Sequence, residues 1–265
     1  EQLTYLAKNL HHRNSSKEFA ELINSATNEL NDYEIDSEDE KISKELNIKL
    51  LNQELDRQRK LDPKLVEKLA RAKSKGYEGW QQAKAESDFK IFLPFFAELI
   101  DLRIEEAKQL SQEYSPWETL AQPYEPEIKK DLLVKIFNPL RKSIPELLER
   151  VKILEGKKWD IEPSAQKNLC SKLLDDFGRE KDLVAVAESP HPFSITLGPK
   201  DFRITTRIVK GEPFSSLLAT AHEWGHSIYE QGLPSQSHQW FSWPLGQATS
   251  MAVHESQSLF WENRI

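Results

Sequence analysis

Two histidines and a glutamate in the stretch Ala221–Glu230 have the spacing of a metal site. His222 and His226 are four positions apart in AHEWGHSIYE, and Glu223 directly follows the first of them. Residues at i and i+4 lie on one face of a helix, so the two imidazoles can share a tetrahedral divalent metal. Zinc is the usual occupant, with cobalt as the alternative. Glu223 would stand beside the metal, where a carboxylate can take a proton from water and pass it to a leaving group.

The alternative interpretation is an amphipathic helix that carries two surface histidines and a solvated glutamate. The surrounding residues favour a packed helix instead. Pro213 can start a helix, and Phe214, Leu217 and Ala221 then recur at helical spacing. Gly225 costs a helix about 1 kcal/mol relative to alanine, so we expect another segment to approach the helix closely there.

A zinc hydrolase needs a third protein ligand and one open position. Glu255 is the predicted ligand, because Gln247 to Asn263 has a helical pattern in which Glu255, Leu259 and Glu262 recur on one face. A glutamate that completes an HExxH site from a second helix is the gluzincin arrangement. His254 points about 100° away from Glu255, so we expect it beside a ligand or facing the substrate.

Four motifs occur in the order seen in one enzyme family. They are HPF at 191–193, DFRIT at 201–205, HEWGHSIYEQGLP at 222–234 and HESQSLFWEN at 254–263. Together they resemble the thermostable metallocarboxypeptidases of the carboxypeptidase Taq type, and the similarity extends less specifically to Tyr124-Glu125-Pro126. The resemblance implies release of single residues from the C-termini of peptides, with broad specificity. We also expect the full-length protein to be a homodimer.

The sequence departs from that family in several places. Gln247 stands where a glutamate is expected, and Leu259 where an arginine is expected. The loop around Ser235–Trp243 is about three residues longer than usual in that family. The family's last motif, GxxQDxHW, and the downstream arginine that holds a substrate carboxylate are not found. We expect the N-terminal half of a family member, cut at both ends.

Two other functions stay open at this stage. The chain could be an inactive N-terminal fragment that needs its C-terminal half. It could also be a different HExxH metallopeptidase, one that cuts peptides internally or from the N-terminus.

The residues before the HExxH helix supply candidates for supporting roles and for the substrate cleft. Asp201 could orient a metal-bound histidine through its free ring nitrogen. Arg203 faces either the cleft or solvent. His191 lies between two prolines and has no assigned chemistry. An edge strand beside the cleft could take a peptide backbone by strand pairing.

The whole sequence predicts a mainly α, multi-helix, zincin-like metalloprotease architecture with a small antiparallel β element beside the active-site helix. We expect one continuous fold: a helical region at 1–182, the β element at 183–210, and the two active-site helices at 211–265. In the first region we expect a loop at Lys75-Gly76 and a long helix from Trp80 to Gln109 that buries Phe89, Phe92 and Phe96. The acidic run from Asp32 to Glu45 is interpreted as a solvated connection between helices and a solvated helix face, rather than as a metal site.

Composition excludes several classes of function. The net charge of -7 disfavours nucleic acid or an anionic membrane as partner, because both need a basic face. A single cysteine, Cys170, permits no internal disulfide, so we expect a cytoplasmic protein in which Cys170 is a small buried residue. No apolar run is long enough for a membrane span, and no signal peptide is recognised at the N-terminus.

Overall fold

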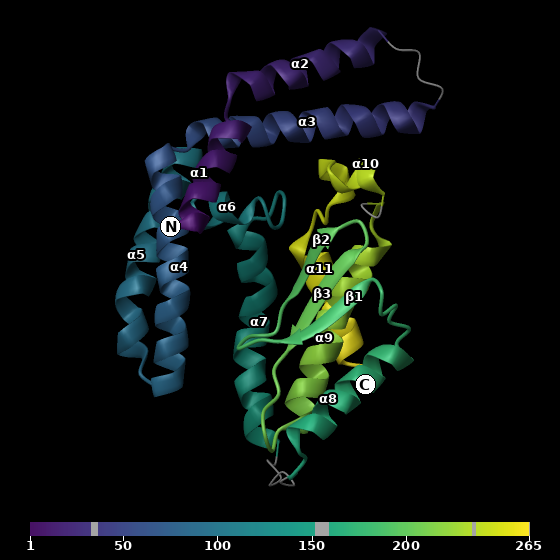
Figure 1. Cartoon of the computed structure of the whole chain (residues 1–265). Coiled ribbons are helices and arrows are strands. Elements are labelled where there is room, and N and C mark those ends of the chain that lie inside the picture. The colour runs from purple at the N-terminus through teal and green to yellow at the C-terminus, as the bar shows by residue number, and fades with distance from the viewer. Residues whose placement is uncertain (33–36, 152–158, 235–236, 265) are drawn as a thin grey trace. The chain divides into compact units, whose positions relative to one another are not determined.

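The computed structural model describes residues 1–32, 37–151, 159–234 and 237–264. The chain divides into two compact units, Glu1–Pro123 and Tyr124–Ile265. The predicted mainly helical architecture with a small sheet is confirmed (Figure 1). The boundaries expected at residues 182 and 210 lie inside the second unit, just before its first strand and just before its HExxH helix.

The first unit consists of packed helices. They are α1 (Gln2–Asn14), α2 (Lys17–Asp32), α3 (Glu38–Lys60), α4 (Pro63–Glu86), α5 (Phe89–Leu110) and α6 (Pro116–Ala121). Leu65, Leu69 and Ala72 of α4 form a buried cluster with Leu102 of α5. Of the acidic run expected to be a solvated connection and face, Asp32 ends α2, residues 33–36 lie outside the described residues, and Glu38 to Glu45 form the start of α3.

The loop expected at Lys75-Gly76 is wrong, and so is the long helix expected from Trp80. α4 continues to Glu86, and the chain breaks at Ser87, which has a left-handed φ of 54°. Asp88 then caps α5, since its side chain accepts a hydrogen bond from the Lys90 N–H at 2.9 Å. The break is therefore set by a cap rather than by a glycine.

The buried aromatic face expected on α5 is also wrong in part. Phe89 and Phe96 are exposed, and their rings contact each other at 6.4 Å between centroids. Leu102, Ala107 and Leu110, further along the helix, are the buried apolar residues of α5.

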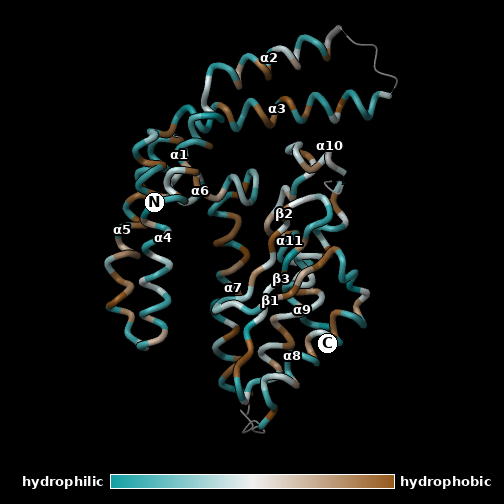
Figure 2. Tube along the Cα trace, in the orientation of Figure 1, coloured by the Kyte–Doolittle hydropathy of each residue, from teal (hydrophilic) through white to brown (hydrophobic). Residues whose placement is uncertain are grey.

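The second unit contains the HExxH helix and the sheet. Its elements are α7 (Lys130–Arg150), α8 (Pro163–Asp176), β1 (Val184–Glu188), β2 (Ser194–Gly198), β3 (Asp201–Thr206), α9 (Pro213–Gly232), α10 (His238–Phe241), η2 (Pro244–Gly246) and α11 (Met251–Glu262). Figure 2 shows apolar residues along α7, several of which, Ile136 and Phe137 among them, are exposed. The loop that was expected to be longer than usual includes residues 235–236, which lie outside the described residues.

In the described residues the sheet has three strands in the order β1-β3-β2 and is mixed. β2 and β3 form the expected antiparallel pair, with Ile195 opposite Arg203. β1 pairs with the other edge of β3 and runs parallel to it, with Val184 opposite Phe202. The expected β element is therefore mixed rather than purely antiparallel. After β1, residues 189–193 cross the end of β3, and β2 runs back along the opposite edge of β3.

Thr205 of β3 holds this crossing segment in place. Its hydroxyl accepts a hydrogen bond from the Phe193 N–H at 3.0 Å and shares another with the Ser189 hydroxyl at 2.6 Å. Ser189 in turn donates to the carbonyl of His191. The HPF and DFRIT motifs are therefore in contact, and the threonine of one fixes the turn that carries the histidine of the other.

Replacing Thr205 by valine should destabilise the second unit. The substitution keeps the shape of the buried Thr205 side chain but removes its hydrogen bonds to the Phe193 N–H and the Ser189 hydroxyl, each worth about 0.5–1.5 kcal/mol. Thr196→Val on β2 is the control, because the described residues show no side-chain hydrogen bond at Thr196, and we expect a change within about 0.5 kcal/mol. Urea unfolding followed by circular dichroism measures both. Equal midpoints for the two variants would contradict the anchoring role of Thr205.

The core of the second unit lies between the sheet, α8 and α9. Leu174, Val184, Phe202, Ile204 and Trp224 form one buried cluster, against which the partly buried Phe177 and Trp261 also pack. Burying side chains of this size stabilises a fold by roughly 1.5–3 kcal/mol each. This cluster fixes α9 against one face of the sheet.

Cys170 of α8 is 3% exposed, in agreement with its expected role as a small buried residue.

In the part of the chain that the structure describes, no helix has both the length and the apolar content needed to cross a membrane.

Candidate metal centre

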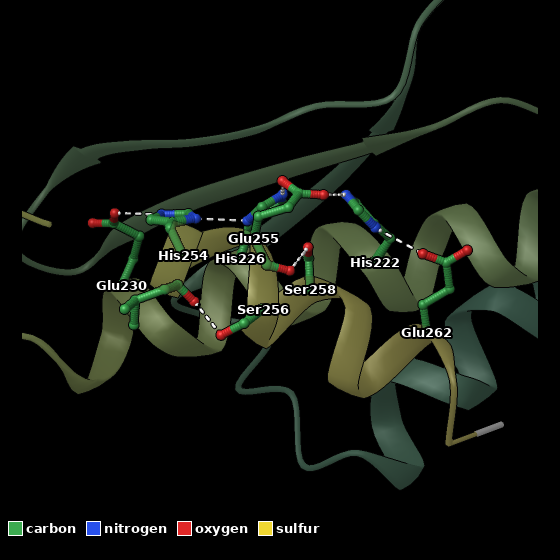
Figure 3. A network of polar contacts seen from close by, with 9 residues as sticks. His222, His226, Glu230, His254, Glu255, Ser256, Ser258 and Glu262 are labelled. Atoms are coloured by element: carbon green, nitrogen blue, oxygen red, sulfur yellow. Dashed lines mark hydrogen bonds and ion pairs between the residues drawn. The ribbon is translucent and has the colours of Figure 1, made fainter. Parts of the chain in front are cut away.

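The helix α9 brings the two histidines of the motif together. It begins at Pro213, whose fixed φ suits the first position of a helix. Ala221 and Trp224 are fully buried, so the helix has one fixed rotation against the core. The rings of His222 and His226, one turn apart, have their centroids at 4.8 Å. Both are partly buried on the side of α9 that meets α11 (Figure 3).

The helix α11 is held at its start by residues from the beginning of the second unit. The carboxylate of Glu125 accepts hydrogen bonds from the Ser250 hydroxyl at 2.8 Å and from the Ala252 N–H at 3.0 Å. The Met251 N–H donates to the carbonyl of Tyr124 at 2.8 Å. A carboxylate at a helix N-terminus is favourable because it pairs with the free N–H groups there. These contacts fix the start of the helix that carries Glu255.

The close approach expected at Gly225 is confirmed, and the approaching segment is α11. A Cβ placed on Gly225 would lie 2.5 Å from the Cα of Ser258 and 2.7 Å from the carbonyl oxygen of Gln257. The backbones of the two helices therefore touch at this glycine. The contact sets how near Glu255 can come to the histidines.

Glu255 lies across from both histidines. Its Oε1 is 3.4 Å from Nε2 of His222, and its Oε2 is 3.5 Å from Nε2 of His226. Ligand atoms of all three residues lie within 4.8 Å of one another. Zinc takes nitrogen and oxygen ligands at about 2.0–2.2 Å, so two ligands of a tetrahedral site are about 3.4 Å apart. The donor set and its spacing fit a divalent metal.

The other ring nitrogens of the histidines have partners of their own (Figure 3). Nδ1 of His222 is 2.9 Å from a carboxylate oxygen of Glu262. Nδ1 of His226 is 2.6 Å from Nδ1 of His254, and Nε2 of His254 is 2.8 Å from a carboxylate oxygen of Glu230. His254 thus lies beside a candidate ligand, one of the two positions expected for it.

Glu223 is buried one residue after the first histidine. Only 7% of it is exposed, and burial raises the pKa of its carboxyl to about 7. Nearby Glu255 also raises this pKa, whereas His222 lowers it. A carboxyl that titrates near neutral pH can both accept and return a proton under the same conditions.

The structure places Asp201 and Arg203 away from the histidines. They form a bidentate pair with each other at 2.8 and 2.9 Å, and this pair holds the pKa of Asp201 below its usual range. Alternation along β3 puts them on the sheet face opposite Phe202 and Ile204, which pack toward α9. The Nδ1 atom of His222 contacts Glu262 rather than Asp201. Arg203 is exposed, and His191 lies in the turn held by Thr205.

Three residues that contact the histidines or the start of α11 have no role assigned from the sequence. They are Glu230, Glu262 and Glu125. The signal for the first two was available, because Glu230 follows His226 by four positions and Glu262 follows Glu255 by seven, both helical repeats of one face. Glu125 belongs to a distant segment, and its contact with α11 carries no local signal.

Comparison with known proteins identifies the family of the chain. The family model described as carboxypeptidase Taq (M32) metallopeptidase matches residues 1–265. Thermostable carboxypeptidase 1 of Thermus thermophilus is 31% identical over 236 residues, which are 83% of this chain and 46% of that protein. The crystal structure of BsuCP aligns with a TM-score of 0.83 at 28% identity, over 98% of this chain and 52% of that one. Metallocarboxypeptidase 1 of Trypanosoma cruzi aligns with a TM-score of 0.76 at 29% identity, over 97% of this chain and 51% of that one.

The chain spans about half the length of the curated relatives that it matches. The match to the family model, by contrast, runs over the full sequence, and it includes the helices that carry His222, His226 and Glu255. This chain belongs to the carboxypeptidase Taq (M32) family of metallopeptidases.

Proposed function

We propose that His222, His226 and Glu255 bind one divalent metal ion, and that the protein releases C-terminal amino acids from peptides. The observation that supports this most directly is the spacing of 3.4 and 3.5 Å between Glu255 and the two Nε2 atoms, which is that of ligands sharing one ion. Zinc as the ion, a broad residue preference and a homodimeric full-length protein stay predictions from the family resemblance.

The chemistry divides between the ion and Glu223. A divalent ion in this position would supply Lewis acidity toward water and toward a peptide carbonyl. Glu223 would accept the proton of the attacking water and deliver it to the amine that leaves. Its burial and its pKa of about 7 support this use of one carboxylate in both directions.

The sheet offers a way to align a substrate. β2 is an edge strand of the described sheet, and Ile195 and Leu197 on it are exposed. A peptide backbone could pair with its open edge, as in other cases of strand addition. We propose this edge as the place where the extended substrate lies.

A second candidate function follows from the length of the match. Because the chain covers 46% of the Thermus relative, this part of the protein could bind the metal and yet need the other half to bind and cleave peptides. The two candidates share the metal site and differ in whether the 265 residues suffice for turnover.

The metal site is tested by the metal content of the purified chain. We expect about one equivalent of a divalent ion per chain, measured by mass spectrometry after dialysis, and a loss of that ion in His226→Ala. His12→Ala, at an exposed histidine of α1, is the control and should retain the ion. No ion in either the parent chain or the control would mean that the three ligands do not form a site in this chain.

The activity is tested with one peptide in two forms. A carboxypeptidase should remove the last residue from the peptide with a free C-terminus and leave the amidated form intact. Equal cleavage of both forms would indicate a different HExxH metallopeptidase. Bound metal with no cleavage of either form would support the candidate that needs its other half.

A further inference from the structure

We propose that Glu262, His254 and Glu230 are positioning residues that fix the tautomers of the two ligand histidines. In the arrangement they select, the Nε2 lone pairs of His222 and His226 both face Glu255. This inference rests on the proposed metal site, and none of the three residues belongs to its proposed set of ligands.

The tautomer of His222 follows from its contact with Glu262. An ionised carboxylate can only accept hydrogen bonds, so the ring nitrogen 2.9 Å from it carries the proton. That nitrogen is Nδ1. In the neutral ring Nε2 then carries a lone pair, and Nε2 is the atom that faces Glu255 at 3.4 Å.

The tautomer of His226 is fixed through a second histidine. His254 directs its Nε2 at Glu230, 2.8 Å away, and therefore donates from that atom. In the neutral ring the Nδ1 of His254 is then an acceptor, and the atom that faces it at 2.6 Å is Nδ1 of His226. His226 must donate there, because two lone pairs would repel at that distance. The Nε2 of His226 therefore carries a lone pair, and this atom faces Glu255 at 3.5 Å.

This selection matters because only one of the four combinations of neutral tautomers that two histidines can adopt leaves both Nε2 atoms as ligands. The two chains of hydrogen bonds select that combination before any ion arrives. Both chains also cross from one helix to the other, since Glu262 and His254 lie on α11 while His222, His226 and Glu230 lie on α9. They thus orient the rings and join the two helices at the site.

The first test reads the tautomers directly in the metal-free chain. Nitrogen-15 NMR of the histidine rings should show the Nδ1–H form at His222. Glu262→Ala should convert His222 to a mixture of tautomers, whereas Glu262→Gln should keep the Nδ1–H form, because its amide oxygen still accepts the bond. An Nε2–H form at His222 in the parent chain would overturn the proposal.

The second test measures metal affinity by competition with a zinc chelator. Loss of a hydrogen-bond partner of a ligand histidine weakens metal binding by about 10–100-fold, and we expect this of Glu262→Ala and of His254→Ala. Glu262→Gln and His254→Asn, which retain an acceptor oxygen, should bind within a few-fold of the parent chain. Glu230→Ala should weaken binding in the same direction, through His254.

Ser256→Ala is the matched control for these variants. Ser256 follows Glu255 on α11, and its hydroxyl bonds to the carbonyl of Val253, outside both hydrogen-bond chains. Its zinc affinity should equal that of the parent chain. Unfolding temperatures of the metal-free variants separate a loss of affinity from a loss of folding.

The outcomes distinguish this inference from the metal site on which it rests. If the parent chain does not bind zinc at all, the proposed function fails, and the NMR result still decides the tautomers. If the parent chain binds zinc and Glu262→Ala, His254→Ala and Glu230→Ala bind it equally well, the positioning role is wrong while the metal site stands.

Discussion

Gly225→Ala is expected to unfold at a much lower denaturant concentration than the parent chain. The added methyl group would meet the Cα of Ser258 at 2.5 Å and the carbonyl oxygen of Gln257 at 2.7 Å. Both atoms belong to the backbone of α11, so relief requires moving the helix. Overpacking of this kind costs about 1–3 kcal/mol, and we expect the upper end of that range because no flexible side chain can give way. Urea unfolding followed by circular dichroism measures the loss.

The same substitution at Gly232 is the control. Gly232 ends α9, and a Cβ there meets nothing within 4 Å. Glycine to alanine within a helix normally gains about 0.5–1 kcal/mol, so Gly232→Ala should be as stable as the parent chain or more stable. Zinc affinity should also fall in Gly225→Ala, because α11 carries Glu255. Similar urea midpoints for Gly225→Ala and Gly232→Ala would show that the backbone of α11 is not in close contact with α9 at Gly225.

Glu223→Gln is expected to retain the metal and lose the rate of peptide hydrolysis. The amide has the shape of the carboxyl but cannot take a proton from water, and removing a general base costs about 10²–10⁴-fold in rate. Because Glu223 lies outside the set of three ligands, metal content should stay at that of the parent chain. Hydrolysis of the peptide with a free C-terminus gives the rate, and mass spectrometry gives the metal.

Glu180→Gln, an exposed residue before the sheet, controls for the change of charge and should leave the rate unaltered. Near-normal turnover in Glu223→Gln would show that another group takes the proton. Loss of the metal together with the rate would show instead that Glu223 holds the site together.

The part of the site that depends on one helix could be predicted from the sequence. The spacing of His222 and His226 follows from helical geometry, and the glycine between them indicated a close neighbour. The hydrogen-bond chain through His254 could not be predicted in the same way, because it needs α9 and α11 to be placed against each other. The position of Asp201 could not be predicted either, because its strand face depends on which side of the sheet α9 covers, and that follows from the packing of Trp224 against Phe202 and Ile204.

The fold shows the same limit in the first unit. Gly76 was interpreted as a loop, whereas α4 passes through it, and nearby Gly79 faces the ring of Phe95 on α5. From the sequence alone, a glycine that ends a helix cannot be told from one that lets a side chain of another helix pack closely. The capping residue Asp88 is the better signal for the break between α4 and α5.

The two helices that supply the ligands are joined by a connection from Leu233 to Ser250, eighteen residues long. The entropy of closing such a connection grows only with the logarithm of its length, and each doubling costs about 0.6 kcal/mol. The extra residues expected in this loop would therefore cost about 0.2 kcal/mol. Added length in this connection therefore changes the folding free energy little, and it can vary between relatives while the ligands on either side of it keep their places.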